Sequence, residues 1–237
     1  MSLISSALGA LRAVGPGLEA KRRQSAKVLA EAILPPRVAV WRTRERRQSP
    51  AKASRIALTF DDGPNSLTPE YLATLAQLGV RATFFVVGEH CEKHPALVKQ
   101  IAGEGHELAG HGYTHRRFTE LSQSELSDEL ERTQALLPRD AYGRRLVRPP
   151  HGAVSLRSLL TCAQKGFTTV LWSFNSDDWR HDDASRVAGA FNARALEAGE
   201  IVLLHEGQTW TIKALPAIVA ELEKAGHELC TVGDLLG

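Results

Sequence analysis

Two histidines four positions apart, His111 and His115, have the spacing of ligands that share one metal ion. In one helical turn or in a tight loop, both imidazoles can face the same ion. Two histidines and one carboxylate form a common hydrolytic metal set, which leaves coordination positions open for water and substrate. An isolated HxxxH pair is more often a surface coincidence, so the interpretation depends on a carboxylate elsewhere in the chain.

Two adjacent aspartates, Asp61 and Asp62, follow an apolar stretch and directly precede Gly63 and Pro64. Gly-Pro favours a turn, so the predicted strand ends there. Two carboxylates at a buried strand end are costly without a cation, because burial and mutual repulsion both disfavour their charged forms. An exposed acidic turn is the alternative. The pair predicts a metal ligand beside a general base.

Three further ionisable residues, Arg148, Asp178 and His205, fall at or after later predicted strands. The carboxyl ends of the strands in parallel α/β proteins share one face, so residues distant in sequence converge there. Without the metal set, Arg148 and Asp178 also fit a structural ion pair, and His205 fits a buried core histidine. Beside a metal, a carboxylate and a histidinium supply the base and the acid that amide hydrolysis needs.

The elements that position these residues alternate between short apolar or β-branched runs and longer helical patterns. This alternation predicts βαβ units around a parallel sheet, arranged as a barrel or as a doubly wound sheet. We expect strands at residues 56–60, 83–87, 107–109, 146–148, 169–174, 201–205 and 228–231. We expect helices to begin near Thr68, Pro95, Ser122, Ser155, Asp183 and Lys213, with a capping box from Ser122 to Glu125.

The length of 237 residues suits one α/β domain, which we expect over residues 55–237, after a basic arm formed by residues 1–54. Residues 1–55 hold twelve Lys or Arg against three acids, a net charge of +9, and the remainder has seventeen against twenty-four, or −7. An amphipathic helix near residues 18–34 and a linker would let the arm contact an anionic surface. A solvated leader and a nucleic-acid contact are the alternatives.

The cysteines and the hydropathy of the sequence indicate in which cellular compartment the protein is expected. The three cysteines are scattered and lack the paired spacing of a zinc knot or a disulfide framework, which favours a reducing compartment. No apolar stretch approaches the length of a membrane span, and the opening segment lacks a positive charge ahead of its apolar run. We expect the cytoplasm or the cytoplasmic membrane face, with peripheral membrane contact through the arm and no nucleic-acid partner.

Five motifs occur in order along the chain: TFDDGP at 59–64, HGYTH at 111–115, RPPHG at 148–152, DDW at 177–179 and LLH at 203–205. Together they resemble the motifs of the NodB-homology polysaccharide deacetylases, carbohydrate esterase family 4. The resemblance runs from about Arg55 to the C-terminus. It implies a distorted (β/α)7 barrel that removes N-acetyl, or O-acetyl, groups from an amino sugar in a bacterial glycan or glycan precursor, with release of acetate.

The resemblance also implies a role for each residue of the metal set. A divalent ion, usually zinc and sometimes cobalt, would be held by Asp62, His111 and His115. Asp61 would be the base that takes a proton from metal-bound water. Arg148 would keep that carboxylate ionised and aimed.

The remaining motifs imply the acid and the substrate contacts. His205 would protonate the leaving amine, and Asp178 behind it would raise its pKa. Trp179 and Leu203 would form a small apolar pocket for the acetyl methyl group. The other implied substrate contacts are Pro149 and His151.

Three positions depart from the family pattern. Gly112 stands where Ser or Thr usually bonds within the loop, Asn175 where Asp is usual, and Glu206 where Asp is common. None of them removes a metal ligand or a proton carrier, so we expect an active enzyme, and a catalytically silent glycan-binding homologue is the alternative. Histidines outside the motifs receive no role; these are His90, His94, His106, His181 and His227.

Overall fold

Strand β2 (Ser54–Gly63) lies at the centre of a parallel sheet, paired with β3 (Thr83–Val86), β8 (Ile201–His205) and β9 (His227–Cys230). The structure, a computed structural model, describes residues 39–40, 42, 54–138, 142–192 and 195–237. All of these residues belong to one compact unit, Pro36–Gly237.

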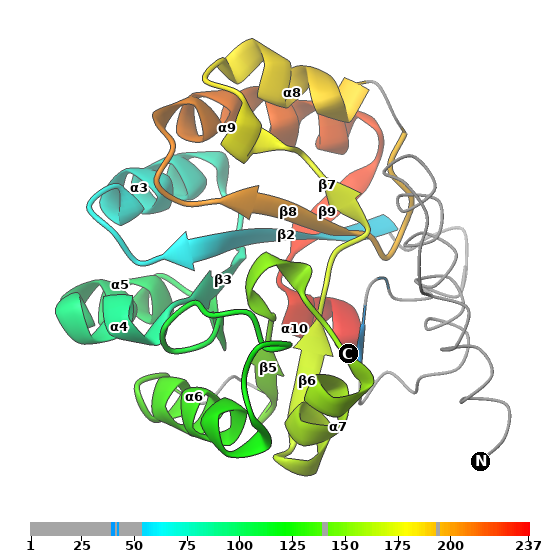
Figure 1. Cartoon of the computed structure of the whole chain (residues 1–237). Helices are drawn as coiled ribbons and strands as arrows, with labels where there is room; N and C mark the ends of the chain where they lie inside the picture. The colour runs from blue at the N-terminus through cyan, green and yellow to red at the C-terminus, as the bar shows by residue number, and fades with distance from the viewer. Residues whose placement is uncertain (1–38, 41, 43–53, 139–141, 193–194) are drawn as a thin grey trace, which may run out of the picture. The chain divides into compact units, whose positions relative to one another are not determined.

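The described strands form one sheet in the order β1-β6-β5-β4-β3-β2-β8-β7, and every pairing between them is parallel. The remaining strands are β1 (Ala39–Val40), β4 (Glu107–Gly110), β5 (Arg145–Val147), β6 (Phe167–Val170) and β7 (Phe174–Asn175). Among the described strands no pairing joins the two ends of this order, so the predicted barrel is present as a curled half-barrel. Figure 1 shows the helices around its outer face.

Five of the six predicted helices begin at or next to the expected residue, and two further helices of the described residues, Gly88–Lys93 and Val232–Leu236, were not predicted. The helices are α3 (Thr68–Leu78), α4 (Gly88–Lys93), α5 (Pro95–Gly103), α6 (Gln123–Ala135), α7 (Leu156–Gln164), α8 (Ala184–Asn192), α9 (Thr209–Lys224) and α10 (Val232–Leu236), with 3-10 turns at η1 (Pro150–Gly152) and η2 (Asp178–Arg180). The capping box of Ser122 and Glu125 is confirmed. The expected start of α9 near Lys213 is one turn late, because Thr, Trp and Ile in the first turn are weak helix formers.

One predicted strand is wrong. The run at 169–174 forms two strands at different places in the sheet, because β6 pairs with β5 and β1 whereas β7 pairs with β8. Residues 171–173 carry the chain across the open side of the half-barrel. A continuous apolar run therefore concealed a break in the sheet.

The two faces of β2 explain where a site can form. Ile56, Leu58 and Phe60 point outward into a core shared with the helices, whereas Ala57 packs with Phe85 in a second cluster on the inner face. Thr59 and Asp61 continue that inner face toward the carboxyl end of the strand. The inner face therefore changes from apolar to polar where the predicted site lies.

Among the described residues of the predicted arm, Ala39 and Val40 form strand β1, Arg42 makes an isolated bridge to Glu200, and Ser54 begins β2. Ala39 and Val40 pair with Thr169 and Val170 of β6, within the segment assigned to the basic arm from the sequence. The predicted amphipathic helix at 18–34 lies outside the described residues. In the described part of the chain, no helix combines the length and the apolar character needed to cross a membrane.

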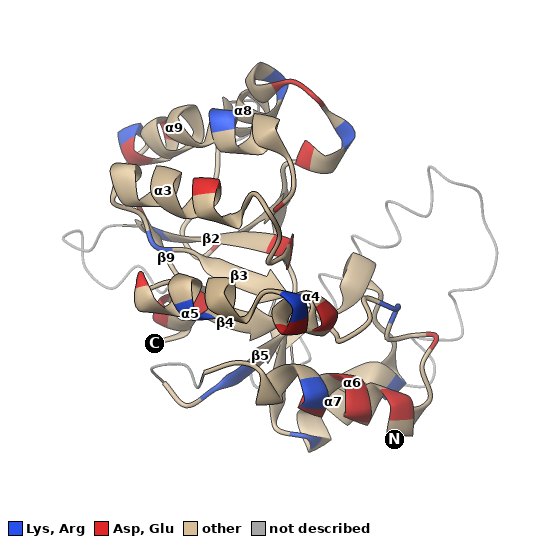
Figure 2. Ribbon diagram, turned by 90° about the vertical axis from the view of Figure 1, so that its left-hand side faces the viewer, with Lys and Arg blue, Asp and Glu red and all other residues tan. Residues whose placement is uncertain are grey.

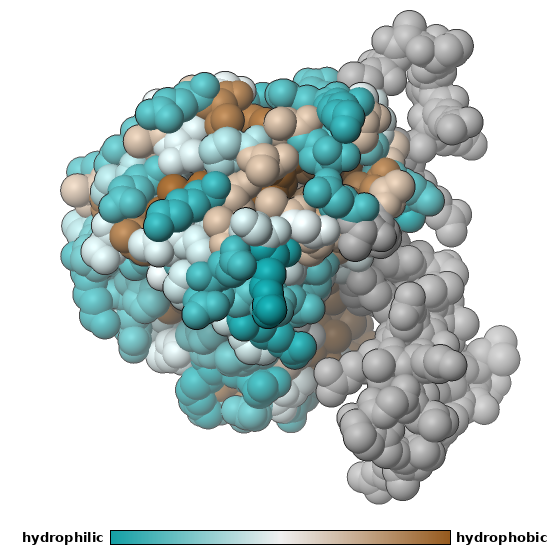
Figure 3. All heavy atoms as spheres, turned by 90° about the horizontal axis from the view of Figure 1, so that it is seen from above, coloured by the Kyte–Doolittle hydropathy of each residue, from teal (hydrophilic) through white to brown (hydrophobic). Residues whose placement is uncertain are grey.

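In the view of Figure 2, charged residues of both signs are spread over the described helices. Figure 2 shows Lys and Arg interspersed with Asp and Glu on the outer helices. The face in Figure 3 is largely hydrophilic, with apolar side chains in small patches. The distinctive chemistry of the fold therefore lies at the carboxyl ends of the strands.

Candidate metal and catalytic site

A bulge at the end of β2 turns two adjacent carboxylates toward the same place. Consecutive side chains of a regular strand point to opposite faces, so Asp61 and Asp62 would normally diverge. Pairing with β3 shifts register between Asp61 and Gly63, and Asp62 has a left-handed backbone with φ 75°. The strand thus extends three residues beyond the predicted end, and the aspartates lie within it.

The bulge brings Asp62 to the two histidines of the loop after β4. Oδ1 of Asp62 lies 3.1 Å from Nε2 of His115 and 3.4 Å from Nε2 of His111. One ligand atom from each residue falls within 4.8 Å of the others. Burial alone would raise the pKa of Asp62, but hydrogen bonds to both imidazoles hold it far below its ordinary value. Two imidazole nitrogens and a carboxylate oxygen suit a divalent ion such as zinc or cobalt.

Hydrogen bonds behind the ligands fix their orientation. Nδ1 of His111 lies 2.8 Å from the carbonyl oxygen of Arg148. A carbonyl oxygen only accepts, so Nδ1 carries the proton and Nε2 presents its lone pair to the ligand set. His90, which received no role from its sequence, lies with Nδ1 2.9 Å from the carbonyl oxygen of Asp62 and braces the bulge.

Asp61 forms a buried ion pair with Arg148. Nη1 of Arg148 donates to Oδ1 of Asp61 at 2.6 Å and to Oγ1 of Thr59 at 2.8 Å. Oδ2 of Asp61 lies 3.6 Å from Nε2 of His111, on the side of the ligand set. Arg148 is fully buried, and burial lowers its pKa although Asp61 opposes that shift. One carboxylate oxygen is thus engaged by the guanidinium, and the other faces the site.

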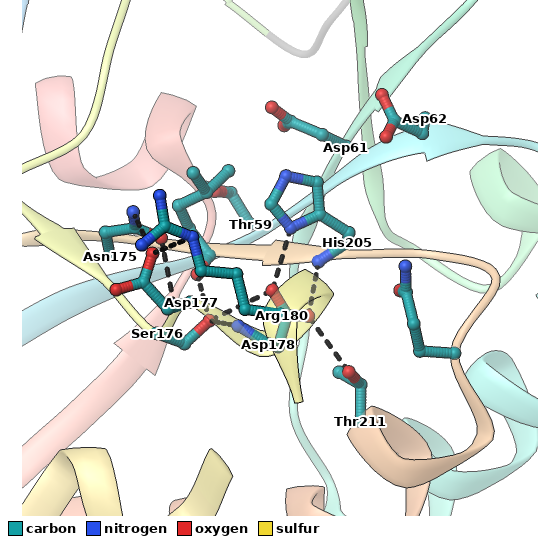
Figure 4. A network of polar contacts seen from close by, with 12 residues as sticks. Thr59, Asp61, Asp62, Asn175, Ser176, Asp177, Asp178, Arg180, His205 and Thr211 are labelled. Carbon is teal, nitrogen blue, oxygen red and sulfur yellow. Dashed lines mark hydrogen bonds and ion pairs between the residues drawn. The ribbon is translucent and has the colours of Figure 1, made fainter. Parts of the chain in front are cut away.

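A second pair, Asp178 and His205, lies beside Asp61 and Asp62 (Figure 4). Nδ1 of His205 lies 2.7 Å from Oδ1 of Asp178. The other carboxylate oxygen of Asp178, Oδ2, accepts from the backbone N–H of His205 at 2.8 Å and from the Thr211 hydroxyl at 2.9 Å. Burial alone would lower the pKa of His205, but the hydrogen bond and charge of Asp178, together with the charges of Asp61 and Asp62, outweigh it, so the pKa is raised. The opposite edge of the imidazole faces the two aspartates.

The four residues expected to touch substrate occupy different surroundings. Trp179 on η2 is 51% exposed, whereas Leu203 is buried on the inner face beside Thr59. His151 has φ 58° and is exposed, with its ring centroid 4.7 Å from that of His115. Pro149 is buried directly before η1. Trp179 and His151 are therefore available to a substrate, and Leu203 would form the floor of a pocket.

Asn175 fits its position better than a second carboxylate would. Its Nδ2 donates to Oδ1 of Asp177 at 2.9 Å, and its Oδ1 accepts from the backbone N–H of Asp177 at 3.1 Å. An aspartate could accept but could not donate, and it would face a like charge. The amide closes the turn in which Asp177 has φ 53°, so this departure from the family pattern has a local structural reason.

Glu206, the residue after the proposed acid, packs under the bulge. Oε1 accepts from Thr68 at 2.6 Å, and Oε2 has no hydrogen-bond partner among the described residues. Burial, together with the charge of Asp62, raises the pKa of Glu206 to about 7, against the opposing hydrogen bond of Thr68. A Cβ built on Gly63 would lie 1.4 Å from Oε2, so this carboxyl group requires glycine at that position.

Replacing Gly63 with Ala is therefore expected to destabilise the protein by about 1–3 kcal/mol through overpacking. Each kcal/mol should lower Tm by about 2–4 °C for a domain of this size. Thermal unfolding measures the effect. Gly103→Ala is the matched control, because a Cβ there meets nothing within 4 Å, and it should leave Tm unchanged or slightly raised. Equal melting temperatures for the two variants would contradict the prediction.

Three features meet at one end of the parallel half-barrel: a set of metal ligands, a buried carboxylate paired with an arginine, and a histidine hydrogen-bonded to an aspartate. Together they define a metal-assisted hydrolase. Comparison with known proteins agrees. Residues 48–170 match the polysaccharide deacetylase family. The chain belongs to that family, and the resemblance inferred from its motifs is confirmed.

Characterised relatives act on amino-sugar glycans. The peptidoglycan-N-acetylglucosamine deacetylase PgdA of Listeria monocytogenes is 36% identical over 77% of this chain and 39% of that protein. A peptidoglycan-N-acetylglucosamine deacetylase of Bacillus cereus is 35% identical over 76% of this chain and 87% of that protein. A crystal structure of a peptidoglycan N-acetylglucosamine deacetylase has a TM-score of 0.74 at 29% identity and covers 84% of this chain and 92% of that chain. The chain spans about two fifths of the Listeria protein, 39% of its length.

Proposed function

We propose that the protein hydrolyses the N-acetyl group of an amino sugar in a bacterial glycan or glycan precursor and releases acetate. The observation that carries the proposal is the arrangement of three ligand atoms within 4.8 Å, with the Asp61–Arg148 and Asp178–His205 pairs beside them. The deacetylase relatives support N-acetylglucosamine as the sugar and peptidoglycan as the glycan. Chitin oligomers, which contain the same sugar, are the alternative substrate class. Removal of O-acetyl groups uses the same chemistry.

Asp62, His111 and His115 would hold the divalent ion, for which we propose zinc and keep cobalt as an alternative. When bound, the ion would polarise the acetyl carbonyl group and favour ionisation of a water molecule. Three protein ligands leave room for both. Nδ1 of His111 is already committed to a carbonyl oxygen, so the histidine enters the site in the tautomer that a metal requires.

Two side chains would complete the reaction, one that takes a proton and one that gives a proton. Asp61 would take a proton from the attacking water at Oδ2, because Arg148 occupies Oδ1. The water oxygen bonds to the acetyl carbon, and the bond from that carbon to nitrogen breaks. His205 would give its Nε2 proton to the leaving amine, since its Nδ1 side faces Asp178.

Substrate contacts would come from the rim of the site. Trp179 and Leu203 would surround the acetyl methyl group, and Pro149 and His151 would line the cleft. A backbone N–H near His151 would stabilise the developing oxyanion. Contact of the basic N-terminal segment with an anionic membrane surface, and residence at the cytoplasmic face, stay predictions from the sequence.

Acetate release from N-acetylated oligosaccharides tests the proposal. Protein loaded with zinc should release acetate, protein stripped with a chelator should not, and added zinc or cobalt should restore turnover. Glycan binding without acetate release by the zinc-loaded protein would support the silent homologue instead. Retention of all three candidate ligands and the deacetylase relatives favours the enzyme.

A further inference from the structure

The loop of residues 111–115, which carries both histidine ligands, forms hydrogen bonds with two different helices. Gly112, which follows His111, has φ 74°, and His115 has φ 60°, so the loop departs from regular structure. The carbonyl groups of Gly112 and Tyr113 accept from the backbone N–H groups of Gly88 and Glu89, each at 3.0 Å. These contacts satisfy acceptors of the loop but leave its donors to be accounted for.

Glu129 of α6 accepts from three donors of the same loop. Its Oε2 accepts from the backbone N–H groups of Tyr113 and Thr114 at 2.5 and 2.9 Å, and its Oε1 accepts from the Thr114 hydroxyl at 2.5 Å. The side chain is buried, with 6% of its surface exposed. Three donors converging on two oxygens match an acceptor-only carboxylate. Thr114 directly precedes His115, so the clamp acts next to a metal ligand.

Gly112 leaves room for this clamp. A Cβ on Gly112 would lie 3.2 Å from Phe118 and 3.4 Å from Oε2 of Glu129, in a backbone conformation that side chains rarely adopt. A Ser or Thr at 112 would therefore be strained here. The Thr114 hydroxyl and the Glu129 carboxylate provide the bonding within the loop that a hydroxyl at 112 would otherwise give.

We propose that Glu129 is a positioning residue of the metal site, which holds the loop of residues 111–115 so that Nε2 of His115 meets Asp62. The inference rests on the metal site of the proposed function but not on any substrate. Glu129 is not one of the three candidate ligands, so this role is separate from theirs.

Zinc affinity, measured by competition with a chromophoric chelator, tests this role. Glu129→Ala leaves the backbone N–H groups of Tyr113 and Thr114 without this acceptor and is expected to weaken zinc binding about 10- to 100-fold. Glu129→Gln should stay within about threefold of the unsubstituted protein, because the amide oxygen accepts from the N–H groups and the amide nitrogen can donate to the Thr114 hydroxyl. Asp128→Ala, on the exposed face of the same helix, is the matched control and should not change the affinity.

A purely structural role would give a different result. In that case Glu129→Ala would lower Tm while zinc affinity stayed within about threefold, and the inference would be overturned. The visible spectrum of the cobalt-loaded protein adds a geometric readout, which should change for Glu129→Ala and be restored for Glu129→Gln. If Glu129→Ala does not fold, Thr114→Val decides: a several-fold loss of zinc affinity supports the clamp, and an unchanged affinity overturns it.

The two proposals fail separately. Zinc-loaded protein that never releases acetate from any N-acetylated oligosaccharide contradicts the deacetylase function, while the affinity series still decides the role of Glu129. An active enzyme whose zinc affinity is insensitive to Glu129→Ala contradicts only the positioning role.

Discussion

Replacing Asp61 with Asn is expected to lower kcat/KM for acetate release about 10³-fold, within the range of a lost general base. Asn keeps the shape of the side chain and a hydrogen-bond acceptor for Arg148, but its amide cannot take a proton from water. Asp61 lies beside the ligand set rather than in it, so zinc should remain bound with one ion per chain. Steady-state assays and metal analysis of the same preparation measure the two effects.

The same substitution should also destabilise the fold. Arg148 is fully buried, and its other hydrogen bonds in the described structure go to neutral oxygens of Thr59, Val170 and Leu171. Removing the one partner of a buried ion pair typically costs about 3–5 kcal/mol, because the remaining charge stays desolvated. Urea unfolding of the metal-free protein measures this cost.

Asp128→Asn on the exposed face of α6 controls for the loss of one negative charge, and both its activity and its stability should match the unsubstituted protein. An Asp61→Asn protein that keeps more than about a tenth of the activity would contradict the assignment of Asp61 as base. Loss of zinc together with activity would instead make Asp61 part of the ligand set.

The position of the site was predictable because it depends on a simple property of parallel sheets. Strands separated by helices run in the same direction, so their carboxyl ends meet, and residues placed after them converge whatever their separation in sequence. The aspartates, the histidine pair, Arg148 and His205 all follow this rule. The helix boundaries were predictable for a different reason: turn and capping residues, such as Ser122, act on their own neighbours in the sequence, so their signals are local.

Features set by contacts between distant residues were missed. Strands β1 and β7 have two residues each, too few for any periodicity, and they exist because β6 and β8 offer unpaired edges. The bulge at Asp62 depends on register with β3, which no local pattern records. Consequently the sequence placed both aspartates after the strand and could not explain how adjacent side chains reach one site.

Glu129 was missed although the sequence contains a signal for it. Leu126, Glu129, Leu130 and Thr133 have the spacing of one helix face, and all four are buried. A charged residue among the buried positions of an amphipathic helix indicates a specific polar partner, since burial of an unpaired charge is too costly. The acidic, polar run around it concealed this signal.

Replacing Asp178 with Asn is expected to lower kcat/KM about 10²-fold at neutral pH and to move the alkaline limb of the pH profile toward lower pH. Burial lowers the pKa of His205, and the largest opposing contributions are the hydrogen bond and charge of Asp178, with smaller ones from Asp61 and Asp62. In the variant, burial remains and lowers the pKa, so the imidazolium that protonates the amine is lost at lower pH. Asn also replaces one acceptor oxygen with an amide N–H group, which must face either Nδ1 of His205 or the two donors on the other side, Thr211 and the backbone of His205.

Stability should follow the same linkage. A histidine whose folded pKa is raised contributes stability that is fully present below its ordinary pKa and is lost as pH rises through the folded value. The difference in unfolding free energy between the unsubstituted protein and Asp178→Asn should therefore be largest in mildly acidic solution and decrease as the pH rises. Asp177→Asn, at an adjacent carboxylate that is only partly buried, should leave both profiles unchanged. An alkaline limb that stays in place for Asp178→Asn would show that His205 is not the group whose ionisation limits turnover, and the acid would have to be sought among other residues facing Asp61 and Asp62.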